Sequence, residues 1–149
     1  MTTSPRRSAL ALLLAAGILP AIAGCGETTA PKTGPEIDLL SGLGLDNGKR
    51  WSADEHTGRV AGEMVAAVRR AAGRNDAAAT TALGNELQEL LNRLVAGCTM
   101  QGPAHEALHV YLSALMPRVS TMHGGDAAAA SRARAEVARL LERFADYFG

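Results

Sequence analysis

The chain has 149 residues, of which 47% are hydrophobic, 3% aromatic and 20% charged. This length accommodates one domain and excludes a two-domain enzyme, a large (β/α)₈ barrel and a polytopic membrane protein. Fifteen basic and fifteen acidic residues give a net charge of zero, which argues against a nucleic-acid-binding protein because such proteins carry a basic surplus.

The first 24 residues have the pattern of a secretory signal peptide. Arg6 and Arg7 precede a short apolar run, and small residues follow that run directly before Cys25. The apolar run is too short for an ordinary membrane-spanning helix. The sequence Ile-Ala-Gly-Cys at 22–25 resembles the lipobox of bacterial lipoproteins.

In that family the signal is cut before the cysteine, which then carries lipid on its sulfur and its amine. The resemblance implies lipidation at Cys25, which would anchor the protein in the membrane of the bacterial cell envelope, facing the periplasm. An ordinary secretory signal with an incidental cysteine is the alternative. The resemblance leaves open whether the inner or the outer membrane holds the lipid.

Residues 25–50 are expected to hold the lipidated cysteine, a flexible tether and an apolar lead-in. The tether, residues 26–36, is rich in Gly, Pro and Thr. Asp46-Asn47-Gly48 predicts a turn at the end of the lead-in. With Cys25 acylated, Cys98 is the one remaining thiol, so no intramolecular disulfide is expected.

Residues 51–149 are expected to contain four amphipathic helices. Ser52 and Glu55 have the spacing of a capping box for the first helix, and Gly73 is its expected stop. The second starts near Asn75 or Asp76 and ends at Gly97. The third starts at Pro103 and breaks at Gly124-Gly125, and Asp126 caps the fourth. The expected inward-facing residues are Val60, Met64, Val68 and Ala71; Leu83, Leu87, Leu90 and Leu94; Leu108, Leu112, Leu115, Val119 and Met122; and Ala133, Val137, Leu140, Phe144 and Tyr147.

These segments predict an all-α fold, an antiparallel up-down-up-down four-helix bundle. The alternation of three- and four-residue spacings suits knobs-into-holes packing. In that topology the start of the first and third helices and the close of the second and fourth share one end. This end would collect Trp51, His56, Cys98, His105 and Phe144.

The same end is predicted to hold a transition-metal site. Cys98, Met100, His105 and His109 lie within twelve residues, and the two histidines are four apart on one helical face. A thiolate, two imidazoles and a thioether suit copper, and three of these donors also suit zinc. His56 is a candidate further ligand or hydrogen-bond partner of a ligand.

Each of these residues also has an ordinary structural interpretation. Histidines at this spacing occur as hydrogen-bonded core residues, and Cys98 could be a small buried hydrophobe. Met100 could serve packing alone. Trp51 is expected to plug the bundle end.

Several catalytic patterns are absent from the sequence. It has no C-x-x-C-H for covalent haem, no pair of E-x-x-H motifs for a di-iron centre, and no glycine-rich phosphate loop. Cys98 and His105 could form a nucleophile–base pair, but no oxyanion arrangement is readable. The sequence therefore does not predict an enzyme.

The segment 98–109 follows the pattern C-x-M-x-G-x-A-H-x-x-L-H. It resembles a segment of small, uncharacterised bacterial exported helical proteins, and residues 45–51 resemble their lead-in. The resemblance implies that the two segments form one unit. It attaches no activity to them.

The function predicted from these patterns is transition-metal binding by a periplasm-facing lipoprotein, with copper favoured over zinc, for sequestration, sensing or transfer. One alternative is a structural or adaptor lipoprotein that docks an envelope partner and binds no metal. Another is a haem-binding bundle, in which Met64 and a histidine of the third helix would be the axial ligands.

Overall fold

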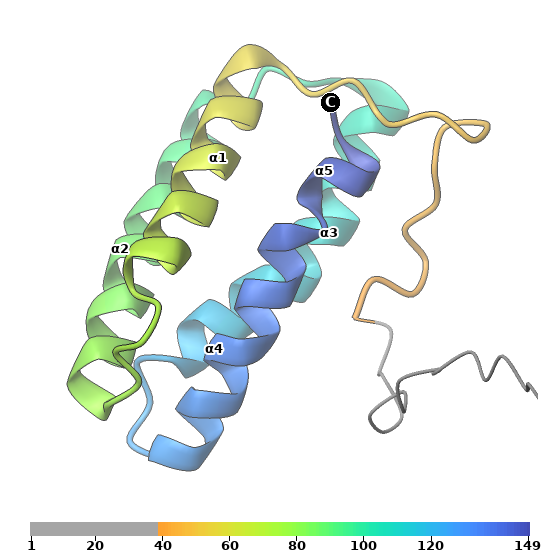
Figure 1. Ribbon diagram of the computed structural model, residues 1–149. Helices are drawn as coiled ribbons and strands as arrows, with labels where there is room; N and C mark the ends of the chain where they lie inside the picture. The colour runs from red at the N-terminus through yellow and green to blue at the C-terminus, as the bar shows by residue number, and fades with distance from the viewer. Residues whose placement is uncertain (1–38) are drawn as a thin grey trace, which may run out of the picture. The chain divides into compact units, whose positions relative to one another are not determined.

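The computed structural model describes residues 39–149 (Figure 1). The chain divides into two compact units, and the second, Glu36–Gly149, contains every described residue. The predicted signal peptide and Cys25 lie outside the described residues. The elements are α1 (Glu55–Arg70), α2 (Ala77–Gly97), α3 (Gly102–Thr121), α4 (Ala127–Glu142) and the single turn α5 (Phe144–Tyr147).

An aspartate begins three of the helices. The side chains of Asp54, Asp76 and Asp126 accept hydrogen bonds from backbone N–H groups in the first turns of α1, α2 and α4. Such caps satisfy donors that have no partner within the helix. The predicted starts at Asp76 and Asp126 are confirmed. The predicted capping box at Ser52 is wrong, because Asp54 occupies the cap position of α1.

The predicted stripes of α2 and α3 are confirmed: Leu83, Leu87, Leu90 and Leu94, and Leu108, Leu112, Leu115, Val119 and Met122 are all buried. In α1, Val60, Met64 and Ala71 are buried and Val68 is half-buried. In α4, Ala133, Val137 and Leu140 are buried. Helices with one continuous apolar face are stabilised mainly by burying it together.

The fourth helix is shorter than its periodicity predicts. α4 ends at Glu142, with Arg143 as its C-cap, and Phe144 and Tyr147 belong to the separate turn α5. Phe144 and Phe148 are four positions apart, as on a continuous helix, so the sequence pattern does not indicate this break. Phe144 and Phe148 stack at a centroid distance of 4.9 Å and both meet the ring of Tyr111 edge-on.

The helices pack as an all-helical bundle. α1 packs most closely against α2 and α3 against α4, whereas the contact between α1 and α4 is less extensive. Residues 39–149 form no strand beyond two isolated β-bridges. Among these residues, no helix is both long and apolar enough to cross a membrane.

The lead-in contributes directly to the core. Leu40 and Leu43 are buried in the same cluster as the helix stripes. The predicted turn at 46–48 is present, with Asn47 and Gly48 at positive φ and reciprocal backbone bonds of 2.8 Å between Asp46 and Lys49. Two positive φ values are what a tight hairpin turn of this kind requires.

Trp51 joins the lead-in to the C-terminal segment. Its indole N–H donates to the carbonyl of Gly44 at 2.7 Å. Its backbone N–H donates to Tyr147 at 2.7 Å, and its carbonyl accepts from Gly149 at 3.0 Å. Trp51 and Phe148 thereby form a parallel bridge. The half-buried indole packs against the core.

Candidate functional site

Asp54 connects the start of α1 to the segment between α2 and α3. Its Oδ1 accepts from the backbone N–H of Thr57 at 2.6 Å. Its Oδ2 accepts from both the backbone N–H and, at 2.9 Å, the hydroxyl of Thr99. One carboxylate therefore caps a helix and also fixes the residue that follows Cys98.

These hydrogen bonds determine the charge state of Asp54. Partial burial of the carboxyl opposes ionisation, but the hydrogen bonds from Thr57 and Thr99 outweigh it and hold the pKa of Asp54 well below its ordinary value of 3.8. The carboxylate is consequently ionised throughout the neutral and mildly acidic range. A fixed negative charge lies at the N-terminus of α1, where the helix dipole favours it.

We expect Asp54→Ala to lower the free energy of unfolding by about 2 kcal/mol at pH 7, because it removes a helix cap and a charge-assisted link to Thr99. Since the folded-state pKa lies below the unfolded value of 3.8, the stabilisation is present above that pH and is lost as pH falls below it. Urea unfolding at pH 7 and pH 3 measures this. The difference between wild type and variant should shrink at pH 3, and an unchanged difference would contradict the role of the charge.

Asp54→Asn is the matched control. Asparagine also caps helices well, so this variant retains the bond to Thr57 and removes the charge together with the second acceptor oxygen, which serves Thr99. At pH 7 its destabilisation should be smaller than that of Asp54→Ala, and it should also shrink at pH 3, because both variants remove the carboxyl group that titrates.

The structure brings three of the predicted site residues into one chain of contacts. Cys98 Sγ lies 3.8 Å from His105 Nδ1. His105 Nε2 in turn lies 2.8 Å from His109 Nε2, with the two rings edge-on. Cys98 and His105 are half-buried, and His109 is exposed. Sulfur and the second imidazole therefore contact opposite nitrogens of His105.

This arrangement restricts which protons the rings can carry. A hydrogen bond between the two Nε2 atoms requires one donor and one acceptor. If His105 Nε2 is the donor, its Nδ1 presents a lone pair toward Cys98 Sγ, and His109 carries its own proton on Nδ1. In this tautomer a thiol or a bound cation can lie against His105 Nδ1.

Both ring nitrogens of His56 form hydrogen bonds with residues outside the chain of contacts from Cys98 to His109. Its Nε2 lies 2.8 Å from the carbonyl oxygen of Arg93, so Nε2 must be the donor. Its Nδ1 lies 3.1 Å from the guanidinium of Arg59 and accepts from it. Both nitrogens of His56 are thus used, and neither is directed at Cys98 or His105 by any contact within residues 39–149.

Gly97 lies directly beneath the imidazole of His56. A Cβ atom built on Gly97 would lie 2.3 Å from His56 Nε2. No side chain can be accommodated there while the ring stays in place. Glycine at this position therefore permits α2 and the first turn of α1 to approach closely next to Cys98.

Met100 is a residue of the hydrophobic core, two positions after Cys98 in the sequence. It is 9% exposed and belongs to the hydrophobic core, against which Cys98 packs. The thioether thus fills space in the hydrophobic core. Within residues 39–149, no group of three or more His, Cys, Asp and Glu side chains is placed to hold one metal ion.

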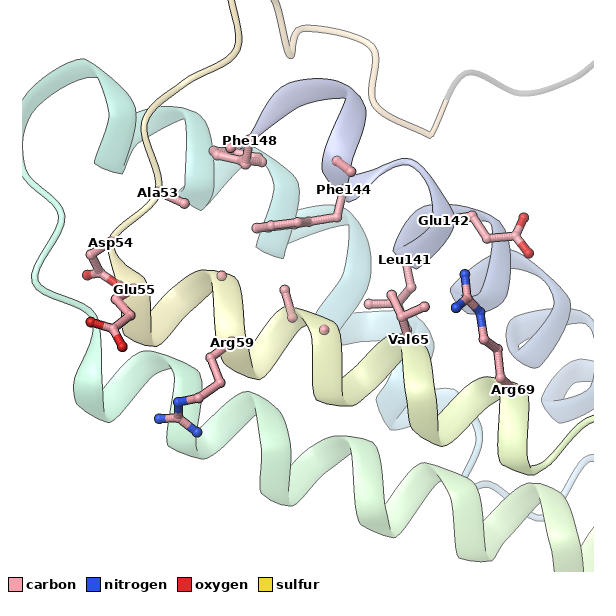
Figure 2. Close-up of a pocket in the computed structure, with 15 residues that line it drawn as sticks. Ala53, Asp54, Glu55, Arg59, Val65, Arg69, Leu141, Glu142, Phe144 and Phe148 are labelled. Atoms are coloured by element: carbon pink, nitrogen blue, oxygen red, sulfur yellow. The ribbon is translucent and has the colours of Figure 1, made fainter.

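A groove with a volume of about 940 Å³ lies between α1 and the C-terminal segment, residues 141–149, which comprises the end of α4, the turn α5 and the last two residues (Figure 2). Its α1 side presents small residues, including Gly58, Ala61 and Gly62. Its other side is formed by Leu141, Phe144 and Phe148, among others. The sequence patterns did not predict this groove, although the small residues at three- and four-residue spacing in α1 are a signal that could have suggested it.

The sequence analysis also missed the link from Asp54 to Thr99. The threonine lies 45 positions away in the sequence and belongs to no local pattern. Comparison of the chain with family models, with curated proteins and with solved structures finds no match.

Proposed function

We propose that this protein is a periplasm-facing bacterial lipoprotein that binds a copper ion between Cys98 and His105. The proposed role is sequestration, sensing or transfer of the metal. Lipid at Cys25 would attach the protein to the membrane of the cell envelope. The observation that carries the metal assignment is the separation of 3.8 Å between Cys98 Sγ and His105 Nδ1.

This separation suits an ion that contacts both atoms. Metal bonds are about 2.3 Å to thiolate sulfur and about 2.0–2.1 Å to imidazole nitrogen. With these lengths, donors 3.8 Å apart subtend an angle of roughly 120° at the ion. That angle is typical of a site with three ligands. The existing positions of the two side chains would need little adjustment.

His109 then acts on the metal through His105. Imidazoles that bind metals generally donate their second N–H to a neighbouring acceptor, which fixes the tautomer and orients the ring. His109 Nε2, at 2.8 Å from His105 Nε2, is placed to accept that proton. An ion chelated by both Nε2 atoms would instead need them about 3.3 Å apart.

The donor set favours copper over zinc. Structural zinc sites close with four protein ligands, whereas Cys98 and His105 offer two, and the thioether of Met100 is the proposed third ligand. Soft sulfur donors select Cu(I), which accepts low coordination numbers. His56 has both nitrogens engaged and is assigned no role as a ligand.

The up-down-up-down order is part of the proposal. Close packing of α1 with α2 and of α3 with α4, each pair joined by a short connection, supports it. The contacts of Asp54 with Thr99 and of Trp51 with Tyr147 are those that this order requires at one end. A site at a bundle end can exchange its ion with a partner protein, which suits transfer.

The test is a Cu(I) titration of residues 36–149, which contain the whole described core and lack Cys25. Competition with a chromogenic chelator gives the dissociation constant, and Trp51 fluorescence reports the folded state. We expect one ion per chain, and at least about 100-fold weaker binding for Cys98→Ser or His105→Gln because each removes a ligand. His109→Gln should weaken binding about 10- to 100-fold.

His56→Asn is the matched control, since it removes an imidazole from the same end of the bundle without removing a ligand. Its affinity should equal that of the wild type. Equal losses of Cu(I) affinity in His105→Gln and His109→Gln would show instead that the ion binds between the two Nε2 atoms. Unchanged affinity in Cys98→Ser and His105→Gln would refute the site and leave an adaptor role as the better proposal.

A further inference from the structure

The groove between α1 and the C-terminal segment is a surface that the metal proposal does not use. In Figure 2, Phe144 and Phe148 lie across the groove from the first half of α1, and Leu141 lies opposite Val65. The groove exists because α1 approaches α4 less closely than it approaches α2. Its walls are mainly apolar, with charged side chains at the rim.

The floor of the groove has open space above it. A Cβ atom added at Gly58 or Gly62 would meet nothing within 4 Å. Small residues on a helix face allow a second backbone to approach closely, so this floor leaves room for another helix to approach α1. The occupant must also complement the charges that the rim presents.

Two of the rim charges, which also include Arg59 and Glu142, lie at opposite ends of α1 and have opposite signs. Glu55 lies in the first turn and Arg69 in the last, and both line the groove and are exposed. Neither forms an ion pair with any residue in 39–149. Each is seven positions from Gly62. Glu55 and Arg69 are therefore placed antisymmetrically about Gly62.

We propose that a second copy of this chain docks its α1 antiparallel into this groove, with the two helices crossing at Gly62. In that register Glu55 of each copy faces Arg69 of the other, so one two-fold axis generates two opposite-charge pairs. A two-fold contact requires a surface that complements itself. Glu55, Gly62 and Arg69 meet this requirement, whereas an unrelated helix would have to match the same spacing by chance.

The antiparallel direction is also favoured by the helix dipoles. The acidic N-terminal turn of one α1 lies beside the basic C-terminal turn of the other, so dipoles and side-chain charges act in the same sense. An interface built on one helix pair lies near the lower limit for specific complexes, about 1,200 Å². We therefore expect a micromolar dissociation constant.

Charge reversal tests the register. Sedimentation velocity of residues 36–149 from about 1 to 200 µM should show a monomer–dimer equilibrium. Glu55→Arg or Arg69→Glu alone replaces both opposite-charge pairs of the dimer with like-charge pairs. Either variant should therefore weaken association at least about 10-fold. The double variant restores both opposite-charge pairs and should return the dissociation constant to within about threefold of the wild type.

Crosslinking tests the crossing point. In a Cys98→Ser background, Gly62→Cys should form an intermolecular disulfide on mild oxidation, because the two Cβ positions meet at the axis. Asn92→Cys, on the exposed face of α2, is the matched control and should crosslink far more slowly. Circular dichroism of each variant confirms the helical fold.

A monomer at 200 µM would overturn the proposal, as would a dimer that Glu55→Arg leaves unchanged or that the double variant fails to restore. Binding of a fatty acid in place of dimerisation, abolished by Gly62→Leu, would assign the groove to a small amphiphile and refute the second copy as its occupant.

Discussion

Tyr111→Ala should lower the free energy of unfolding by about 4 kcal/mol, which is in the range measured for removing a buried aromatic ring. Tyr111 is 2% exposed, and its ring meets those of Phe144 and Phe148 edge-on at 5.4 and 5.9 Å. The truncation would remove the ring that both phenylalanines contact edge-on. Chemical denaturation followed by circular dichroism measures the loss.

The hydroxyl of Tyr111 makes a separate contribution to the free energy of unfolding. It donates to the carbonyl oxygen of Leu140 at 2.9 Å, and burial raises the pKa of the phenol above its ordinary value of 10.0. Tyr111→Phe keeps the ring and should cost only about 1 kcal/mol. Val110→Ala, on the exposed face of the same helix, is the control and should change stability by less than about 0.5 kcal/mol. Equal losses in Tyr111→Ala and Tyr111→Phe would contradict the packing argument.

Gly97→Ala should destabilise the fold by about 2 kcal/mol, although alanine is the better helix former. The added methyl group would overlap the ring of His56, so the ring must leave. It then loses its bonds to the carbonyl of Arg93 and to the guanidinium of Arg59, each worth about 1 kcal/mol. Urea denaturation of both proteins measures the difference.

A double-mutant cycle separates this clash from other causes. In a His56→Ala background the methyl group meets no ring, so Gly97→Ala should become neutral or slightly stabilising, and the coupling should be about 2 kcal/mol. Gly58→Ala is the matched control, since its Cβ atom enters open space and should stabilise α1 by about 0.5–1 kcal/mol. Additive effects of the two changes would show that His56 and Gly97 do not interact.

Much of the fold could be predicted because it depends on local periodicity. The stripes of α2 and α3 repeat at three and four residues, and burial follows that repeat without exception at the predicted positions. The end of α4 could not be predicted in the same way. Phe144 and Phe148 have helical spacing, but their positions are determined by Tyr111 and Trp51, which are distant in the sequence.

The candidate site was predictable in part for the same reason. Cys98 lies four positions after Leu94 and His105 three positions before Leu108, so each continues the apolar stripe of its helix. The predicted up-down order brings these two stripe ends to the same end of the bundle, and the two side chains are in contact there. Periodicity cannot specify which imidazole nitrogen faces the sulfur, so the contact between His109 Nε2 and His105 Nε2 was not predicted. The cap at Asp54 was missed because Ser52 and Asp54 are both good cap residues, and only Thr99 distinguishes them.

The bridge between Trp51 and Phe148 has a consequence for the order of folding. The α1–α2 and α3–α4 pairs involve neighbours in sequence and can form early, because closing a short loop costs little entropy. The bridge joins segments separated by all four long helices and must therefore be among the last contacts to form. The amide of Trp51, which donates to Tyr147, should consequently gain protection from hydrogen exchange later than amides within α2.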